Sequence, residues 1–536
     1  MQNQTEIFQS MERPEFYPHP VAHVETRETH ISKVFLTGDY VYKIKKPENL
    51  GFLDYTTLDK RKYYCQQETI LNRRLSLNIY LGVVAITFKE GRYYLEGPGT
   101  VIEYAVKMRQ LSEDNSMLSL LRRGKINRKA IEQLAQTLTN FYGRVATDGK
   151  IKSFGSLKTI QANCEENFEQ AAPFGGNILD ERLFQIVRAA TRSFLHRRKV
   201  LFKHRVVAGK IRDCHGDLRS GHIYFTDGIQ IIDCIEFNER FRYADITSDL
   251  AFLVMDLDYE GFPKIAQHLI HSYVQYADDP DVFVLIDFYK CYRAVVRAKV
   301  NCLRLAEKAL GEWEKSKLRR ETDRYLNLAY QYAILFTRPT IWVVCGMVAS
   351  GKSTLSEKLS EKLGIKILRS DLIRKKLFGL EPDESMNVPF EEGIYSKGSS
   401  SLIYGKLLML AQEEIEKGAS VILDATFSSK HNRNEALRLA RDMDANIIFI
   451  ECVASVALIK DRLKKRETKI TVSDARLHHY KELKSRFEPL EDITDEMHIQ
   501  IDTQRPIKEN LMKILSHDYG LLSRVIAARS KDHLYG

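Results

Sequence analysis

The sequence lacks the features that define several large classes of protein. No stretch approaches about 18 uninterrupted apolar residues, which argues against a transmembrane helix. Residues 1–6 lack the basic-then-apolar layout of a secretion signal. The eight cysteines are scattered and include no Cys-x-x-Cys pair that would hold zinc or run redox chemistry. These absences together predict a cytoplasmic protein whose thiols stay reduced.

Internal repeats and low-complexity tracts are also absent from the sequence. Hydrophobic residues make up 44% of the chain and charged residues 28%, which excludes a wholly disordered or collagen-like protein. At about 150 residues per domain, the 536 residues correspond to roughly three or four folding units. The 81 Lys and Arg residues exceed the 71 acidic residues, for a net charge of +10. This mild excess favours anionic ligands such as nucleotides but is too diffuse to establish nucleic-acid binding.

The clearest domain boundary lies next to Pro339, which blocks continuation of the long helical pattern before it. We therefore predict one domain over residues 1–337 and a second over 338–536. In the first, strand patterns and one helix over about 20–108 precede a mostly helical region over 109–337, which predicts an α+β domain with a small lobe followed by a large lobe. In the second, strands alternate with helices, as in an α/β domain built on a parallel sheet.

Residues 346–354 fit the pattern G-x-x-x-x-G-K-[ST], a Walker A phosphate loop. They directly follow an apolar run at 341–345 and precede a helical pattern at 355–363. This order places backbone N–H groups and a helix N-terminus around phosphates, with Lys352 on the β- and γ-phosphates and Ser353 on Mg²⁺. The motif predicts an ATP or GTP site. Its nucleotide-binding residues are expected to be Gly346, Ala349, Ser350, Gly351, Lys352, Ser353 and Thr354.

Charged residues downstream of this loop suggest a phosphoryl transfer. Asp424 ends an apolar run at 421–424, as expected for a magnesium-associated carboxylate at the end of a strand. Asp371 is positioned to take a proton from an acceptor hydroxyl, and Arg374, one helical turn later, to hold the substrate. Arg462 and Arg466, four residues apart, form either a lid that stabilises the transferring phosphoryl group or a solvated helix face.

The segment from about 341 to 510 resembles the P-loop kinase group that includes polynucleotide 5′-kinases, zeta toxins and chloramphenicol phosphotransferases. The resemblance is carried by the loop at 346–354, the pair Asp371-x-x-Arg374 and the arginine lid. It implies that Asp371 is the general base toward a hydroxyl. The acceptor does not carry over, because members of the group phosphorylate nucleic-acid ends, sugar-nucleotides and antibiotics.

A second set of catalytic residues surrounds His215-Gly216-Asp217. Two short apolar segments follow and are joined by a turn at residues 227–228, which places Asp217 and Asp233 near each other at one end of a hairpin. Phosphoryl transfer needs one carboxylate to orient the acceptor hydroxyl and another to hold Mg²⁺. Asp217 suits the first role and Asp233 the second.

Residues 25–300 resemble the aminoglycoside phosphotransferase and choline kinase group, whose catalytic loop reads His-Gly-Asp-Leu-His-x-Gly-Asn. The resemblance places Lys43 on the strand that carries the nucleotide-binding lysine of this group, with Glu68 on the following helix as its partner. Lys45 lies on the same face of the strand and is the alternative candidate for this lysine. The resemblance also makes 103–106 the hinge that passes the adenine, with Glu103 and Ala105 as contacts.

One residue departs from the pattern of this group. The metal-binding Asn of the family falls on His222, and imidazole is a poorer Mg²⁺ ligand than an oxygen. Either the site relies on Asp233 as its main metal contact, with His222 as a weaker ligand, or its catalysis is weakened. Asp245 and Asp249 match an acidic motif that more often braces the catalytic loop than touches ATP.

The whole chain resembles a bacterial family of fusions between an aminoglycoside phosphotransferase-like, protein-kinase-like domain and a P-loop kinase domain. The first hypothesis is a bifunctional phosphotransferase that uses Mg²⁺ and ATP at two sites to phosphorylate hydroxyl groups of small molecules. The second makes the P-loop half a nucleic-acid 5′-hydroxyl kinase, with basic runs at 197–205 and 460–469 holding the backbone. The third, motivated by His222, makes the N-terminal half a nucleotide sensor that regulates the P-loop kinase.

Overall fold

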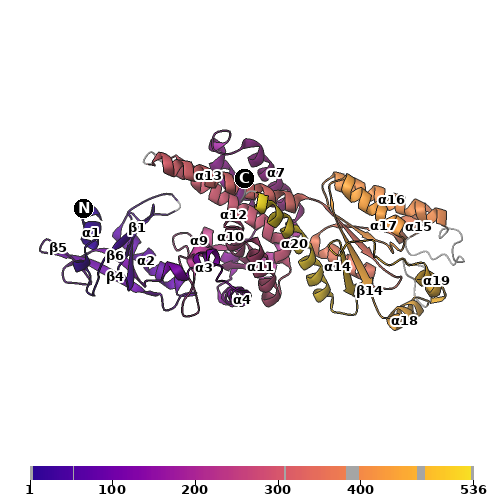
Figure 1. Ribbon diagram of the computed structural model, residues 1–536, viewed down its shortest axis with the longest axis horizontal. Helices are drawn as coiled ribbons and strands as arrows, with labels where there is room; N and C mark the ends of the chain where they lie inside the picture. Colours follow the sequence, from indigo (N-terminus) through magenta and orange to yellow (C-terminus); the bar gives the residue numbers. More distant parts are fainter. Residues whose placement is uncertain (1–3, 52, 307–309, 382–396, 468–476, 533–536) are drawn as a thin grey trace. The chain divides into compact units, whose positions relative to one another are not determined.

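The computed structural model describes residues 4–51, 53–306, 310–381, 397–467 and 477–532 (Figure 1). The chain divides into two compact units, one formed by Met1–Asn163 and Lys203–Asp278 and the other by Cys164–Phe202 and Asp279–Gly536. This division differs from the predicted boundary at 337/338, because long helices that precede Pro339 pack within the second unit. All eight cysteines are buried and unpaired. Within the described ranges, no helix is long and apolar enough to cross a membrane.

The first unit begins with a six-stranded antiparallel sheet in the order β1-β2-β3-β6-β4-β5. One face packs on the N-terminal helix, where Tyr42 and Ile44 of β3 meet Ile7 and Met11. The other face carries Val41, which packs with Cys65 of helix α2. The period of two along the strand therefore directs the odd-numbered residues of β3 toward α2. The elements of this part are α1 (Gln4–Met11), β1 (Glu25–Glu28), β2 (Ser32–Leu36), β3 (Tyr40–Lys45), α2 (Leu58–Asn72), β4 (Tyr80–Lys89), β5 (Arg92–Leu95) and β6 (Thr100–Arg109).

The rest of the first unit is mainly helical and holds two short hairpin-like pairs of strands. Strand β8 pairs antiparallel with β9, as the turn at 227–228 predicted, and β7 pairs with β10. Its helices are α3 (Met117–Arg122), α4 (Arg128–Arg144), α5 (Gly149–Ser153), α9 (Glu239–Arg242), α10 (Ile246–Tyr259) and α11 (Pro263–Ala277). Its strands are β7 (Ile211–Asp213), β8 (Ile223–Phe225), β9 (Ile229–Ile231) and β10 (Tyr243–Asp245). Two further helices, α6 (Leu157–Ala171) and α8 (Lys199–Val207), cross the limits of the units.

The second unit contains the five-stranded parallel sheet predicted for the C-terminal part, in the order β12-β13-β11-β14-β15. Helices α16 and α17 cover one face of this sheet with an apolar core that includes Leu407, Ala411, Ala436 and Ala440. The strands are β11 (Thr340–Cys345), β12 (Lys366–Arg369), β13 (Val421–Asp424), β14 (Asn446–Val453) and β15 (His498–Asp502). The helices are α7 (Glu181–Arg197), α12 (Asp281–Leu305), α13 (Glu312–Thr337), α14 (Lys352–Leu363), α15 (Ser370–Leu377), α16 (Lys397–Glu416), α17 (Lys430–Asp442), α18 (Val456–Glu467), α19 (Tyr480–Ser485) and α20 (Ile507–Asp532).

Candidate active sites

Two lysines of β3 share one glutamate of α2 in the first unit. Lys43 Nζ lies 2.9 Å from Glu68 Oε1 and 2.8 Å from Asp233 Oδ1. Lys45 Nζ lies 2.7 Å from Glu68 Oε2 and also contacts Glu236. The Lys45 side chain is 1% exposed, whereas that of Lys43 is 16% exposed. Lys43 is therefore the lysine that contacts Asp233, the predicted metal-binding carboxylate. Lys45 is buried and forms ion pairs with Glu68 and Glu236.

Asp233 is strongly acidic in this setting. The Lys43 ammonium lowers the pKa of the Asp233 carboxyl well below its usual range. Asp233 also has a backbone φ of 65°, a left-handed conformation that is uncommon outside glycine. Its backbone N–H donates a hydrogen bond to the hydroxyl oxygen of Tyr80, at 3.1 Å. The carboxylate is thus ionised at every physiological pH and is available to a cation.

Two buried carboxylates of α10 hold the catalytic loop in place. Asp249 accepts hydrogen bonds from the backbone N–H groups of His215 (3.0 Å) and Gly216 (2.7 Å) and from the Tyr142 hydroxyl (2.9 Å). Asp256 accepts from the backbone N–H of Ser220 at 2.8 Å and from its hydroxyl at 2.5 Å. Asp249 therefore braces the loop, which is the role that the family resemblance implied.

The side chain of His215 also forms hydrogen bonds that hold this loop. Its Nε2 donates to the Ile232 carbonyl at 3.0 Å, and its Nδ1 accepts from the backbone N–H of Asp217 at 3.3 Å. Burial lowers the pKa of His215 to about 4, so the ring is neutral near pH 7. Gly216 has φ +89°, and a Cβ there would lie 3.0 Å from the Phe241 carbonyl oxygen. The turn therefore favours glycine at position 216.

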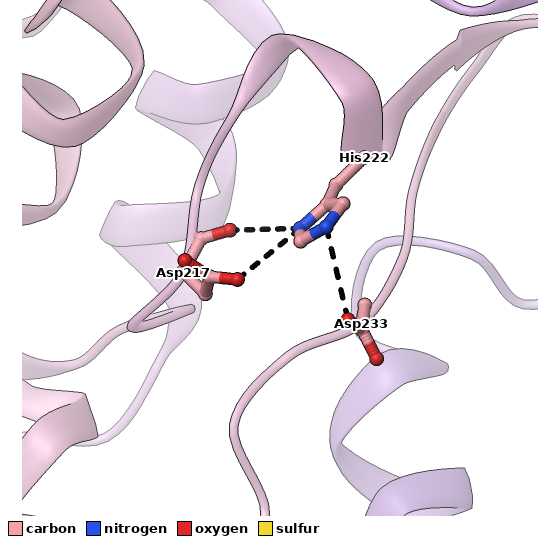
Figure 2. Close-up of side chains that lie close together, drawn as sticks. All are labelled: Asp217, His222 and Asp233. Carbon is pink, nitrogen blue, oxygen red and sulfur yellow. Dashed lines mark hydrogen bonds and ion pairs between the residues drawn. The ribbon is translucent and has the colours of Figure 1, made fainter. Parts of the chain in front are cut away.

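Asp217, His222 and Asp233 form one cluster whose ligand atoms all lie within 4.8 Å of one another (Figure 2). His222 Nδ1 lies 3.0 Å from the Asp217 carbonyl oxygen, and Nε2 lies 3.7 Å from Asp233 Oδ2. The hairpin β8–β9 therefore brings together the two aspartates that the sequence paired. Two carboxylates and an imidazole are a donor set that fits a divalent cation.

Arg219 enters this cluster in a way that the sequence did not reveal. Its guanidinium donates to both carboxylate oxygens of Asp217, at 3.1 and 3.0 Å, and to His222 Nε2 at 2.9 Å. Burial acts to raise the pKa of Asp217, but the Arg219 guanidinium and its hydrogen bonds outweigh burial, and the pKa falls to about 2. The carboxylate of the predicted base is thus engaged by an arginine two residues away.

The predicted hinge at 103–106 lies within strand β6. Glu103 and Ala105 lie in the middle of β6, and their backbone is paired with β4 on one side. Ala105 also pairs with Ile44 of β3 on the other side. Glu103 directs its carboxylate to Arg61 Nε at 2.9 Å, in a buried ion pair. Ala105 is therefore paired on both sides, whereas the ladder with β3 ends before Glu103.

The phosphate loop of the second unit has the predicted arrangement of strand, loop and helix. Gly346 has φ +122°, and a Cβ there would lie 2.5 Å from the Cys452 carbonyl oxygen, so only glycine fits. Lys352 begins α14 and donates from Nζ to the carbonyl oxygens of Gly346 (3.0 Å) and Met347 (2.8 Å). Ser353 is exposed at the same helix N-terminus, together with the neighbouring threonine. The lysine, a serine hydroxyl and the helix N-terminus thus lie together at the end of the loop.

Asp424 lies beside the loop because β13 pairs with β11, which brings Val344 opposite Asp424. Its Oδ2 is buried and has no hydrogen-bond partner among the described residues. Arg369 Nε lies 3.6 Å from this oxygen, beyond hydrogen-bond distance. Burial raises the pKa of Asp424. A buried carboxylate oxygen without a hydrogen bond, next to the exposed Ser353, fits a magnesium ion.

The structure also places the predicted base and lid of the P-loop half. Asp371 lies in the first turn of α15, and Arg374 is buried one turn later. Burial lowers the pKa of Lys352, while Asp424 and Asp371 oppose that shift, so both carboxylates act on the loop lysine. Arg462 donates from Nη1 to the Ala349 carbonyl at 3.0 Å, which puts α18 against the phosphate loop. Arg466 is in the same helix, and its side chain lies outside the described part of the structure.

Several residues that contribute to the two sites were not predicted from the sequence. They are Arg219, Glu236 and Asp256 in the first unit and Arg369 in the second. Arg219 and Glu236 stand two and three residues after the predicted aspartates, so their proximity was available as a signal. Asp256 is 36 residues from the Ser220 that it holds, and no local pattern indicates that contact.

Comparisons with known proteins give relatives over most of the chain. The family model for an AAA domain matches residues 341–490. Uncharacterized proteins of Mycobacterium tuberculosis and Mycobacterium bovis are each 30% identical to this chain over 452 residues, which cover 84% of this chain and 88% of each relative. The match therefore extends across both units.

Solved structures resemble one part of the chain or the other. The GDP complex of aminoglycoside 2′-phosphotransferase-IIIa is 14% identical, with 61% of this chain and 99% of that chain covered and a TM-score of 0.37. A choline/ethanolamine kinase family protein from Mesorhizobium loti is 13% identical, with coverages of 62% and 99% and a TM-score of 0.34. A putative kinase from Chloroflexus aurantiacus is 19% identical, with coverages of 34% and 98% and a TM-score of 0.28. These TM-scores are too low to support an argument about function, which must come from the residues of this chain.

Proposed function

We propose that this chain, which belongs to the family of the mycobacterial proteins and joins an aminoglycoside phosphotransferase-like domain to a P-loop kinase domain, is a bifunctional ATP-dependent phosphotransferase. Each half transfers the γ-phosphoryl group of ATP to a hydroxyl group of a small molecule. The observation that carries the proposal is the position of Lys43, whose ammonium joins Glu68 at 2.9 Å to Asp233 at 2.8 Å. A lysine held between these two carboxylates suits the phosphates of a nucleotide.

In the N-terminal half, each residue has one task. Lys43 binds phosphate oxygens, and Glu68 fixes the direction of the lysine. Asp217 orients the acceptor hydroxyl and accepts its proton as the oxygen attacks phosphorus. Asp233 and His222 would hold a divalent cation, which supplies charge neutralisation for the phosphates.

In the P-loop half, backbone N–H groups of the loop and the N-terminus of α14 bind the phosphates. Lys352 moves from the loop carbonyls to the β- and γ-phosphates, and Asp371 accepts the proton of the acceptor hydroxyl. Ser353 and Asp424 would hold Mg²⁺. Arg462, which contacts Ala349, stabilises charge on the transferring group, and the loop would accept ATP or GTP.

Small-molecule acceptors are favoured over nucleic acid because one of the basic runs is used internally. Arg205 is fully buried and forms an ion pair with Asp245, with 2.8 Å between Nη2 and Oδ1. Arg198, in the same run, donates to the Leu363 carbonyl at the end of α14. Arginines engaged in this way are not free to hold a phosphate backbone. The alternative in which the P-loop half phosphorylates 5′-hydroxyl ends is an outcome of the test below.

A second candidate function follows from Arg219. Because its guanidinium occupies both oxygens of Asp217, at 3.1 and 3.0 Å, the N-terminal half would bind nucleotide without turnover and regulate the P-loop kinase. This sensor function predicts ATP binding that requires Lys43 and no product that requires Asp217.

The test follows the label from γ-labelled ATP in a metabolite extract and, separately, on 5′-hydroxyl RNA. The variants are Asp217→Asn and Lys352→Ala, with Asp227→Asn and Lys358→Ala as matched controls on the same hairpin and the same helix. Lys358 is 47% exposed on α14 and pairs only with a surface glutamate among the contacts that the structure describes. Labelled small molecules lost in one catalytic variant each, and kept in both controls, are expected.

Two other outcomes would overturn parts of the proposal. Label on RNA that survives Asp217→Asn and disappears with Lys352→Ala would replace the small-molecule acceptor of the P-loop half by nucleic acid. Products that never depend on Asp217, together with ATP binding that depends on Lys43, would establish the sensor function.

A further inference from the structure

The imidazole of His222 is oriented as a metal ligand. The Asp217 carbonyl oxygen can only accept a hydrogen bond, so Nδ1 of His222, 3.0 Å away, carries the proton. The lone pair then lies on Nε2, which faces Asp233 Oδ2 at 3.7 Å. Histidines that ligate metals commonly donate their other ring N–H to a backbone carbonyl in this manner. Figure 2 shows the ring between the two aspartates.

We propose that Asp217, His222 and Asp233 form a divalent-cation site that binds first-row transition ions, with Mn²⁺ as the probe, in preference to Mg²⁺. Their ligand atoms lie within 4.8 Å of one another, which is the span of a single coordination sphere. Mg²⁺ prefers oxygen ligands in near-ideal octahedral geometry, whereas Mn²⁺ takes the same carboxylates and begins the series of first-row ions whose affinity for a mixed nitrogen and oxygen site rises toward Cu²⁺. The inference deepens the proposed function, because it names the ion that the N-terminal nucleotide site uses.

Arg219 competes with the ion for the same side chains. Its guanidinium occupies both oxygens of Asp217 and donates to His222 Nε2 at 2.9 Å, which is the atom with the lone pair. A cation can bind to Nε2 only when Arg219 withdraws from it. The site therefore alternates between an arginine-closed state and a metal-bound state, and Arg219 weakens the apparent affinity for metal by the cost of leaving.

The test measures Mn²⁺ binding by the loss of the free-ion electron paramagnetic resonance signal, without nucleotide and without turnover. The full-length protein carries Asp424→Asn, so that the P-loop half contributes no metal site. One bound Mn²⁺ is expected, displaced by Mg²⁺ only at a large excess. Arg219→Gln is expected to tighten Mn²⁺ binding by about tenfold, and Asp233→Asn to weaken it by about tenfold or more.

Replacement of the histidine tests the selectivity separately from the binding. His222→Asn supplies an amide oxygen in place of the imidazole nitrogen, so the preference for Mn²⁺ over Mg²⁺ should fall by about tenfold while a metal site remains. Asp227→Asn removes an exposed carboxylate from the turn of the same hairpin, and it should leave Mn²⁺ binding unchanged. Asp227→Asn keeps the side-chain size, His222→Asn makes the side chain smaller, and a folding defect in either variant is visible as a lowered Tm.

The proposal is wrong if Mn²⁺ binding is unaffected by both Asp233→Asn and His222→Asn, or if Mg²⁺ displaces Mn²⁺ at equal concentration. An unchanged affinity in Arg219→Gln would refute the competition. These failures are distinct from failure of the proposed function, which is measured independently by Lys43-dependent binding of a fluorescent ATP analogue in Mg²⁺.

Discussion

Replacing Asp249 by Asn isolates the hydrogen bonds that hold the catalytic loop. Asp249 is fully buried; Oδ1 accepts from the Gly216 N–H, and Oδ2 accepts from the His215 N–H and the Tyr142 hydroxyl. Asn keeps one acceptor oxygen and replaces the other by an NH₂ group. If the oxygen stays with the two donors, the Gly216 N–H loses a bond to a charged acceptor and faces another donor. That loss costs about 2–3 kcal/mol.

Hydrogen exchange of the loop amides reads this loss directly. Since about 1.4 kcal/mol is a factor of ten, exchange of a peptide spanning residues 211–224 should be roughly 30- to 150-fold faster in Asp249→Asn. Tyr142→Phe removes one neutral donor and leaves both backbone bonds intact, so its effect should stay near about 1 kcal/mol. Exchange in Asp249→Asn that matches the wild type, or that equals the Tyr142→Phe rate, would refute the assignment of Asp249 as the brace.

Three further predictions test the two lysines, the phosphate loop and a buried acid. Among the described residues, Lys45→Met leaves the buried Glu236 with only the Tyr55 hydroxyl and Glu68 with only Lys43, and it should cost about 3–5 kcal/mol in urea unfolding. Lys43→Met should mainly abolish nucleotide binding measured by fluorescence, and equal stability losses in the two variants would contradict the division of roles. Gly346→Ala should eliminate ATP binding by the P-loop half, because its Cβ would lie 2.5 Å from the Cys452 carbonyl oxygen, and normal titration by calorimetry would refute the steric argument. Asp518 lines a cavity of about 380 Å³ with Arg198 and Asp287, and burial raises its pKa from 3.8 to about 7. The folded protein then binds this proton more tightly than the unfolded chain, so stability falls as pH rises from about 4 to 7; Asp518→Asn should raise Tm at pH 8 and leave it unchanged at pH 4, and the opposite trend would contradict the shift.

The local arrangement of both candidate sites could be predicted from the sequence because each depends on neighbouring residues. The strand at 341–345, the loop at 346–354 and the helix after it follow one another without interruption, and backbone geometry alone turns that order into a phosphate site. The pairing of Asp217 with Asp233 likewise needs only a turn at 227–228 between two short strands. In both cases the partners are close in the chain, so a local rule decides the outcome.

The tertiary structure alone decided the features that join distant segments. The predicted hinge at 103–106 lies within β6, whose register is set by its pairing with β4 and, from Ala105 onward, with β3. The brace by Asp249 links residues 33 and 34 positions apart, and Arg61 meets Glu103 across 42 positions. No sequence period encodes such contacts, since they arise only when the core packs. Arg219 is the intermediate case: it is two residues from Asp217, yet only the fold shows that its side chain turns back onto Asp217 and onto His222.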